Sequence, residues 1–190
     1  LAADTCPMLS DRLKLILSLL VTYLVWGSTY LAIRIGVESF PPLMLAALRF
    51  LLAGGSMYLW LRLRGVAAPS NRQWRNAALV GGMMLTIANG SVTYAEKTVS
   101  SGVAALVVGL VPLLTVLAAW IWGTRPSRRE WIGISIGLLG VIWLSTGQQL
   151  RASPQGALLL VLASVSWAFA SVWMRRLEMP SGPMSVAAQM

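Results

Sequence analysis

Residues 103–122 read VAALVVGLVPLLTVLAAWIW, twenty residues in succession without a charged side chain. At a helical rise of about 1.5 Å per residue, a run of this length covers about 30 Å, the thickness of the hydrocarbon core of a bilayer. The run therefore predicts a transmembrane helix. Helices are expected rather than barrel strands, because barrel strands alternate apolar and polar residues over about ten positions.

Five further segments of the chain are similarly apolar. In chain order, the six expected spans are 13–33, 43–61, 77–95, 103–122, 131–146 and 156–174. Short connections with proline and serine separate them, so consecutive helices should be antiparallel. Of the 190 residues, 57% are hydrophobic and 11% are charged, and the mean hydropathy is +0.72. The sequence therefore predicts an all-α membrane protein with six transmembrane helices.

The positive charges lie almost entirely between the spans. The formal net charge is +9, from 15 Lys and Arg residues against 6 Asp and Glu residues. Eleven of these cations lie at one side of the membrane and three at the other, while Arg49 falls deep inside a span. Because cytoplasmic loops are enriched in Lys and Arg, we expect a cytoplasmic N-terminus. The basic character then reflects membrane topology, and nucleic acid is not an expected partner.

Several classes of chemistry are not expected from this composition. Histidine is absent and Cys6 is the single cysteine, so we expect no metal site, no cofactor and no intrachain disulfide. Serine, threonine and tyrosine are the remaining nucleophiles and have no evident base, so an enzyme is not expected. No acidic residue lies in the middle of a span; Glu96, at a helix end, is the candidate for a coupling acid.

A weak internal repeat relates the sixth span to the first. An offset of 141 residues aligns three pairs: Trp26 with Trp167, Arg34 with Arg175, and Pro42 with Pro183. Five spans separate the two copies, so the second copy enters the membrane from the opposite side. Inverted repeats of this kind build many transporters.

Several short motifs follow one another along the first five spans. They are VWGSTY at 25–30, PP at 41–42, ALRF at 47–50, SGVAAL at 101–106, Pro112, and Glu130 ahead of Gly133, Gly137 and Gly140. Taken together, these motifs resemble the first EamA repeat of the drug/metabolite transporter superfamily. The resemblance covers about residues 13–144 and implies a ten-helix protein of two inverted five-helix repeats. It also implies export of metabolites, amino acids or drugs across the bacterial inner membrane.

We therefore expect a cytoplasmic leader at 1–12, a first five-helix EamA repeat at 13–147 and a truncated start of a second repeat at 156–190. Residues 1–7 read either as spurious upstream sequence or as the edge of a fragment. The expected function is transport of a small molecule by alternating access between inverted repeats. The alternative is a truncated or split membrane module that needs a partner half; a homodimer is also open. Lipid is the expected environment.

Polar residues spaced by three or four positions form stripes on three of the spans. Such a stripe is either a wall of a substrate cavity or a surface for helix association. Trp26 and Trp167 lie near mid-span, where they are either ligand walls or core packing. The cavity candidates are Thr22, Trp26, Thr29, Tyr30, Arg49, Asn89, Thr93, Tyr94, Glu96, Trp167 and Ser171.

Arg49 and the helix-breaking residues have mechanical as well as functional interpretations. An arginine near the bilayer centre costs roughly 2.5 to 3.5 kcal/mol, so Arg49 should reach the interface, pair with Glu38 or Glu96, or contact substrate. Pro112 should kink or unwind the fourth span, and the freed carbonyls should find neighbours or line a cavity. Gly133, Gly137 and Gly140 share one helix face, which predicts a packing seam within the chain or in a dimer.

Overall fold

The computed structural model describes residues 11–146 and 153–190, and all the regular elements in these ranges are helices. They are α1 (Asp11–Ser39), α2 (Pro42–Leu63), α3 (Asn71–Gly81), the π-helix η1 (Gly82–Asn89), α4 (Gly90–Ala95), α5 (Ser101–Val108), α6 (Val111–Ile121), α7 (Arg128–Thr146), α8 (Pro154–Met174) and α9 (Pro183–Gln189). The prediction of an all-α chain is confirmed for the described residues. Cys6, most of the expected leader and the connection before α8 lie outside them.

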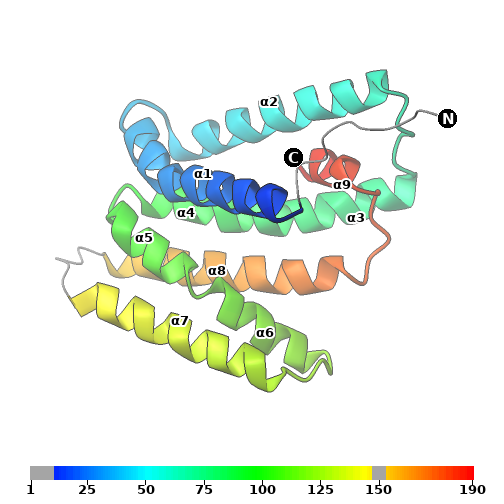
Figure 1. Ribbon diagram of the computed structural model, residues 1–190. Coiled ribbons are helices and arrows are strands. Elements are labelled where there is room, and N and C mark those ends of the chain that lie inside the picture. Colours follow the sequence, from blue (N-terminus) through cyan, green and yellow to red (C-terminus); the bar gives the residue numbers. More distant parts are fainter. Residues whose placement is uncertain (1–10, 147–152) are drawn as a thin grey trace.

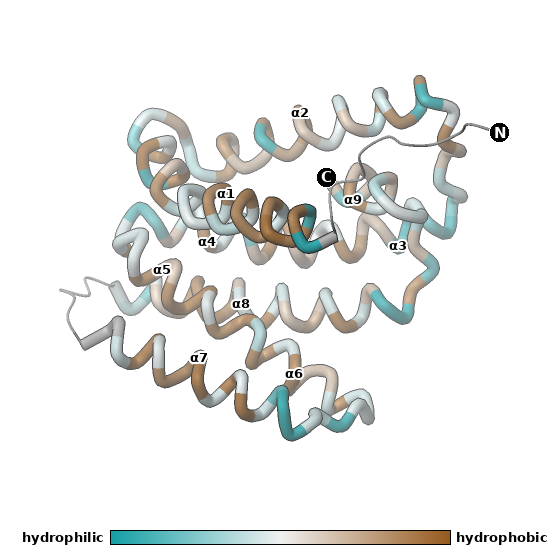
Figure 2. The backbone as a smooth tube through the Cα atoms, viewed as in Figure 1, coloured by the Kyte–Doolittle hydropathy of each residue, from teal (hydrophilic) through white to brown (hydrophobic). Residues whose placement is uncertain are grey.

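Four helical stretches are long and apolar enough to cross a membrane: Arg12–Ser39, Pro42–Leu63, Ser101–Ile121 and Pro154–Met174. They correspond to the first, second, fourth and sixth expected spans. The third and fifth expected spans correspond to α3–η1–α4 and to α7, and their crossing of the membrane stays a prediction. Both stretches run alongside the other helices in Figure 1. Hydrophobic residues predominate along the helices, and hydrophilic residues gather towards the two ends of the bundle (Figure 2).

Serine side chains fix the starts of several helices. Ser70 and Gln73 form a reciprocal capping box at α3, and Ser127 and Glu130 exchange the same two hydrogen bonds at α7. Ser153 accepts a hydrogen bond from the backbone N–H of the first turn of α8. These side chains satisfy N–H groups that have no partner inside the helix, so each helix begins where its connection ends.

The fourth expected span is broken in the middle. Helix α5 ends at Val108 and α6 begins at Val111, immediately before Pro112. Proline removes a backbone donor and clashes with the preceding turn, which accounts for the break. The carbonyl of Val107 accepts a hydrogen bond from Leu110 N at 3.1 Å. Ser164 Oγ of α8 donates to the carbonyl of Leu160 at 2.9 Å and also lies 3.4 Å from the carbonyl of Val107. The helix is thus interrupted next to Pro112, as the sequence predicts. Whether the carbonyl freed by the proline lines a cavity or finds a neighbour stays a prediction.

The third stretch is π-helical in its middle, a feature that the sequence analysis missed. Within η1, the Asn89 side-chain amide donates to the carbonyl of Met84 at 3.2 Å. Ser166 of α8 donates to the carbonyl of Met83 at 2.8 Å. Side chains therefore complete the hydrogen bonding of a segment whose backbone ladder is wider than that of an α-helix.

Helix α8 lies at the centre of the bundle and packs against η1, α4, α5 and α6 (Figure 1). The main buried cluster joins α8 to η1, α4, α5 and the turn before α5, and it consists mostly of small and β-branched residues: Ala88, Val92, Ala95, Val99, Val103, Ala104, Leu160 and Ala163. Small side chains allow close approach of helix backbones, which drives association inside a membrane. Helix α9 packs separately against α2 and α3.

Gly156→Ala should destabilise the fold, because a Cβ at this position of α8 would collide with the Val99 side chain and lie 3.0 Å from Thr98 Oγ1. Overpacking of this kind costs about 1 to 3 kcal/mol. Gly55→Ala on α2 is the matched control, because a Cβ there meets no atom within 4 Å. Thermal unfolding of the detergent-solubilised protein should show a lower midpoint for Gly156→Ala only. Equal midpoints for the two variants would contradict this packing.

Candidate functional site

A cavity of about 720 Å³ lies between α1, α2, η1, α4, α5, α6 and α8. This volume falls in the range of small-molecule sites. Most of its lining is apolar. Six of the predicted cavity residues contribute to that lining: Trp26, Thr29, Tyr30, Arg49, Asn89 and Trp167. The structure therefore brings together residues from four helices that are far apart in the sequence.

The two mid-span tryptophans meet at this cavity. The ring centroids of Trp26 on α1 and Trp167 on α8 are 6.0 Å apart, and the ring planes are inclined by 87°. This edge-to-face geometry is a favourable arrangement for aromatic pairs. The two helices related by the 141-residue offset therefore touch through the aligned pair itself, and both indoles border the cavity.

Arg49 contacts an amide rather than a carboxylate. Its Nη2 donates to Asn89 Oδ1 at 3.3 Å, and the nitrogen of the same amide donates to the carbonyl of Met84. The π-helical turn thus orients the Asn89 oxygen towards Arg49. Glu38 and Glu96, the acidic partners expected from the sequence, do not take this place. An amide supplies a hydrogen bond but no negative charge, so the contact leaves the guanidinium charge unneutralised.

Glu96 lies outside the cavity lining, in the turn that follows α4. Its side chain is fully buried, and neither carboxylate oxygen has a hydrogen-bond partner. Arg34 of α1 donates instead to the backbone carbonyls of Glu96 and Val99. Burial raises the pKa of the Glu96 carboxyl to about 7, and the nearby Arg34 charge opposes this increase. The arrangement is that of an acid that is easily protonated near neutral pH.

The other predicted cavity residues lie elsewhere. Thr22 and Tyr94 are exposed on the bundle surface, whereas Thr93 is buried; Thr22 and Thr93 each donate to a carbonyl four residues earlier in the chain. Ser171 donates to the carbonyl of Trp167 at 2.7 Å. These three hydroxyl protons are bonded within their own helical stretches, so a polar stripe on a helix does not by itself identify a cavity wall.

The glycine face of α7 is open. A Cβ built at Gly133, Gly137 or Gly140 would meet no atom within 4 Å. Gly133 and Gly137, together with Pro112, line a second cavity of about 350 Å³. Among the described residues, no helix packs closely on this face, so the expectation of a seam within the chain is not met. A seam with a second copy stays a prediction.

Apolar cavity residues were the ones that sequence reasoning missed. Phe50, Leu85, Val108 and Ala163 all line the cavity, yet nothing distinguishes them from the other apolar residues of these helices. Ser164 also lines the cavity, three residues before Trp167 on α8. Its spacing from Trp167 and Ser171 places it on the polar stripe that the sequence predicts for the sixth span, although it was not among the cavity candidates.

Four apolar helices of spanning length define a multi-pass membrane protein. Its cavity lies among α1, α2, α5–α6, α8 and the α3–η1–α4 stretch. Residues 13–146 match the EamA-like transporter family, and the chain belongs to that family.

Relatives of known name agree with this membership. The chain is 48% identical over 174 residues to "Uncharacterized inner membrane transporter YedA" of Escherichia coli, a match that covers 91% of this chain and 57% of the relative. It is 30% identical over 167 residues to "Probable amino-acid metabolite efflux pump" of Salmonella typhimurium, covering 83% and 52%. The chain thus spans about half the length of these relatives. No solved structure matches.

Glu96→Gln should stabilise the protein at pH 8. The native pKa of about 7 lies above the ordinary 4.5, so the native state binds the proton more tightly than the unfolded state. The free energy of unfolding should therefore fall as pH rises from about 4.5 to about 7 and level off above that. Removing the charge should raise the free energy of unfolding by roughly 1 to 3 kcal/mol at pH 8 and have little effect on it at pH 4.

Thermal unfolding in detergent at pH 4, 6 and 8 measures this effect. Glu178→Gln is the control, because Glu178 forms an exposed ion pair with Arg72 at 3.3 Å. A Glu96→Gln midpoint that follows the native protein at each pH would show that Glu96 is not buried as described.

Proposed function

We propose that the protein transports small amphipathic metabolites across the bacterial inner membrane, with the cavity between α1, α2, η1, α4, α5, α6 and α8 as part of its substrate site. The observation that supports this most is that the cavity lies within the apolar bundle and combines tryptophan walls with a few polar groups. These are Thr29, Tyr30, Arg49, Asn89 and Ser164. Sites with mostly apolar walls and a few placed polar groups suit small ligands.

The direction and mechanism of transport are proposals too. We propose export by alternating access, in which inverted repeats move around a central site. Two irregular segments support this, because η1 and the break between α5 and α6 both border the cavity, at Asn89 and at Pro112. Helix interruptions at membrane depth are tolerated where they line a cavity, and they are the places where a helix bends with least loss of hydrogen bonds.

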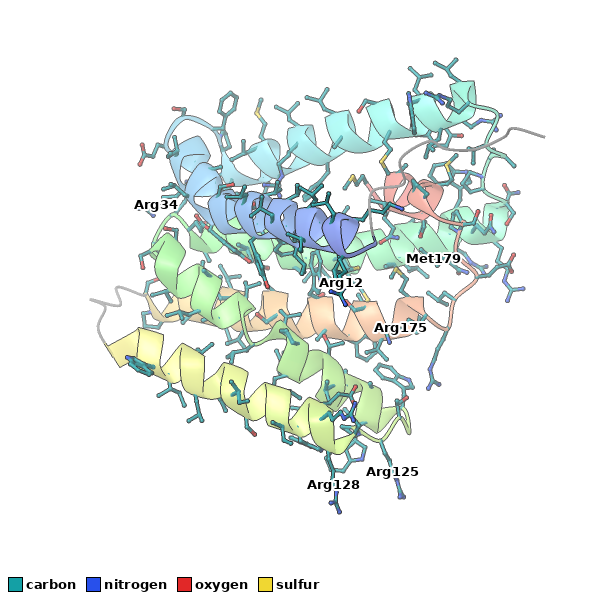
Figure 3. The ribbon with its side chains drawn as sticks, in the orientation of Figure 1. Arg12, Arg34, Arg125, Arg128, Arg175 and Met179 are labelled. Carbon is teal, nitrogen blue, oxygen red and sulfur yellow. The ribbon has the colours of Figure 1, made fainter. Side chains whose placement is uncertain are left out.

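We also propose a cytoplasmic N-terminus. Arg125, Arg128 and Arg175 lie at one end of the bundle and Arg34 at the other (Figure 3). The end with the larger number of arginines is the cytoplasmic one by the positive-inside rule. The start of α1 lies towards that same end in Figure 1.

Trp167→Ala should reduce the flux of a transported compound at least tenfold, which corresponds to about 1.4 kcal/mol of lost transition-state stabilisation. The variant removes one cavity wall. Because Trp167 also packs against the core cluster of small residues, thermal unfolding of the variant is measured beside its flux. Thr22→Val is the matched control, because Thr22 lies on α1 outside the cavity and should retain full flux. The measurement is efflux of preloaded small amphipathic compounds from cells that express the full-length protein, or from proteoliposomes that contain it.

Two outcomes would contradict the proposal. Normal flux in a correctly folded Trp167→Ala variant would remove the cavity from the transport pathway. Flux that requires a separately supplied partner half would support the alternative of a split module. Neither outcome depends on knowing the natural substrate, because a panel of compounds that differ in size and charge serves as the probe.

A further inference from the structure

We propose that the cavity selects monovalent organic anions with a flat apolar body, and that Arg49 binds their negative charge. The inference rests on the proposed role of this cavity as the substrate site and names the class of compound that the site accepts. Three observations support it: the unbalanced charge of Arg49, the tryptophan walls, and the absence of acidic residues among the described lining residues.

The charge of Arg49 is not balanced within the cavity. Its hydrogen-bond partner, Asn89, is a neutral amide, and its other close contact is the Phe50 ring at 4.7 Å from the guanidinium carbon. None of the described residues that line the cavity is acidic. A guanidinium in apolar surroundings is costly without a counter-charge, and a carboxylate is the group that its planar donors fit in pairs.

Asn89 prepares Arg49 for this role. The amide nitrogen of Asn89 is held by the Met84 carbonyl, which turns the amide oxygen towards Arg49 Nη2. One nitrogen of the guanidinium is therefore anchored to η1. A guanidinium has five N–H donors in a planar fork. An anchored guanidinium therefore still has donors that can bind a carboxylate. A fork held in one orientation loses less entropy when the anion binds.

The walls beside Arg49 fit an apolar ring. Trp26 and Trp167 meet edge to face at 6.0 Å and present extended aromatic surface at the cavity. Leu85 and Val108 supply further apolar lining. An aromatic or other flat body can therefore stack against indole while its carboxylate reaches the arginine.

The same lining disfavours other charge states. A cation would meet the Arg49 charge in a medium of low dielectric constant, where like charges repel strongly. A zwitterion would bring an ammonium group, yet no described lining residue offers a carboxylate to receive it. Glu96 does not fill this role, because it is buried in the turn after α4 and outside the lining. The expected order of affinity is anion, then neutral compound, then zwitterion and cation.

Equilibrium binding to the complete protein in lipid nanodiscs tests this order. The probes are 3-phenylpropionate, 3-phenylpropionamide, phenylalanine and 3-phenylpropylamine, which share a ring and chain and differ in charge. We expect the anion to bind at least tenfold more tightly than the amide. Arg49→Gln should remove this difference, because it should weaken binding of the anion far more than binding of the amide. Lys97→Gln is the control, because it removes an exposed positive charge outside the cavity lining and should retain the preference.

The outcomes separate this inference from the proposed function. Equal binding of anion and amide to the native protein would overturn the anion preference, whether or not the protein transports. An equal loss of affinity for all four probes in Arg49→Gln would overturn the role of Arg49 as the anion ligand. An Arg49-dependent anion preference without any flux would support the inference and contradict transport.

Discussion

Polar groups that lie within apolar helices must find their partners inside the protein, because lipid offers none. Most features of the bundle follow from this constraint. The widened turn of η1 is completed by Asn89 and by Ser166 of α8. At the break before Pro112, the backbone N–H of Leu110 donates to the carbonyl of Val107. Helix α8 supplies Ser166 for this purpose and packs against both η1 and α6.

The same constraint accounts for the place of the cavity. Irregular backbone costs least where side chains or a hollow surround it, and both irregular segments border the cavity. Asn89 is part of both η1 and the cavity. Its amide nitrogen donates to the carbonyl of Met84 within η1, and its amide oxygen accepts from Arg49. A change in the π-helical turn would therefore alter the orientation of the only charged side chain among the described lining residues.

Arg49 and Glu96, the basic and the acidic residue among the cavity candidates, lie in opposite environments. Arg49 remains in a cavity where a ligand could reach it, whereas Glu96 is enclosed in the turn beyond α4 with its carboxylate unpaired. Burial without a hydrogen-bond partner favours the neutral form of the Glu96 carboxyl. Arg34 donates to backbone carbonyls of that turn and not to the carboxylate. Charge that could attract a ligand is thus retained at one place and suppressed at the other.

The sequence by itself determined the helical class and the interruption at Pro112, because these depend on hydropathy and on a missing N–H group. It also identified Trp26, Arg49, Asn89 and Trp167, since polar and large aromatic residues stand out in apolar spans. Only the tertiary structure decided that these four border one cavity and that Glu96 lies apart, because spacing along one helix does not specify which neighbour its face meets. The π-helical turn likewise depended on a serine from another helix.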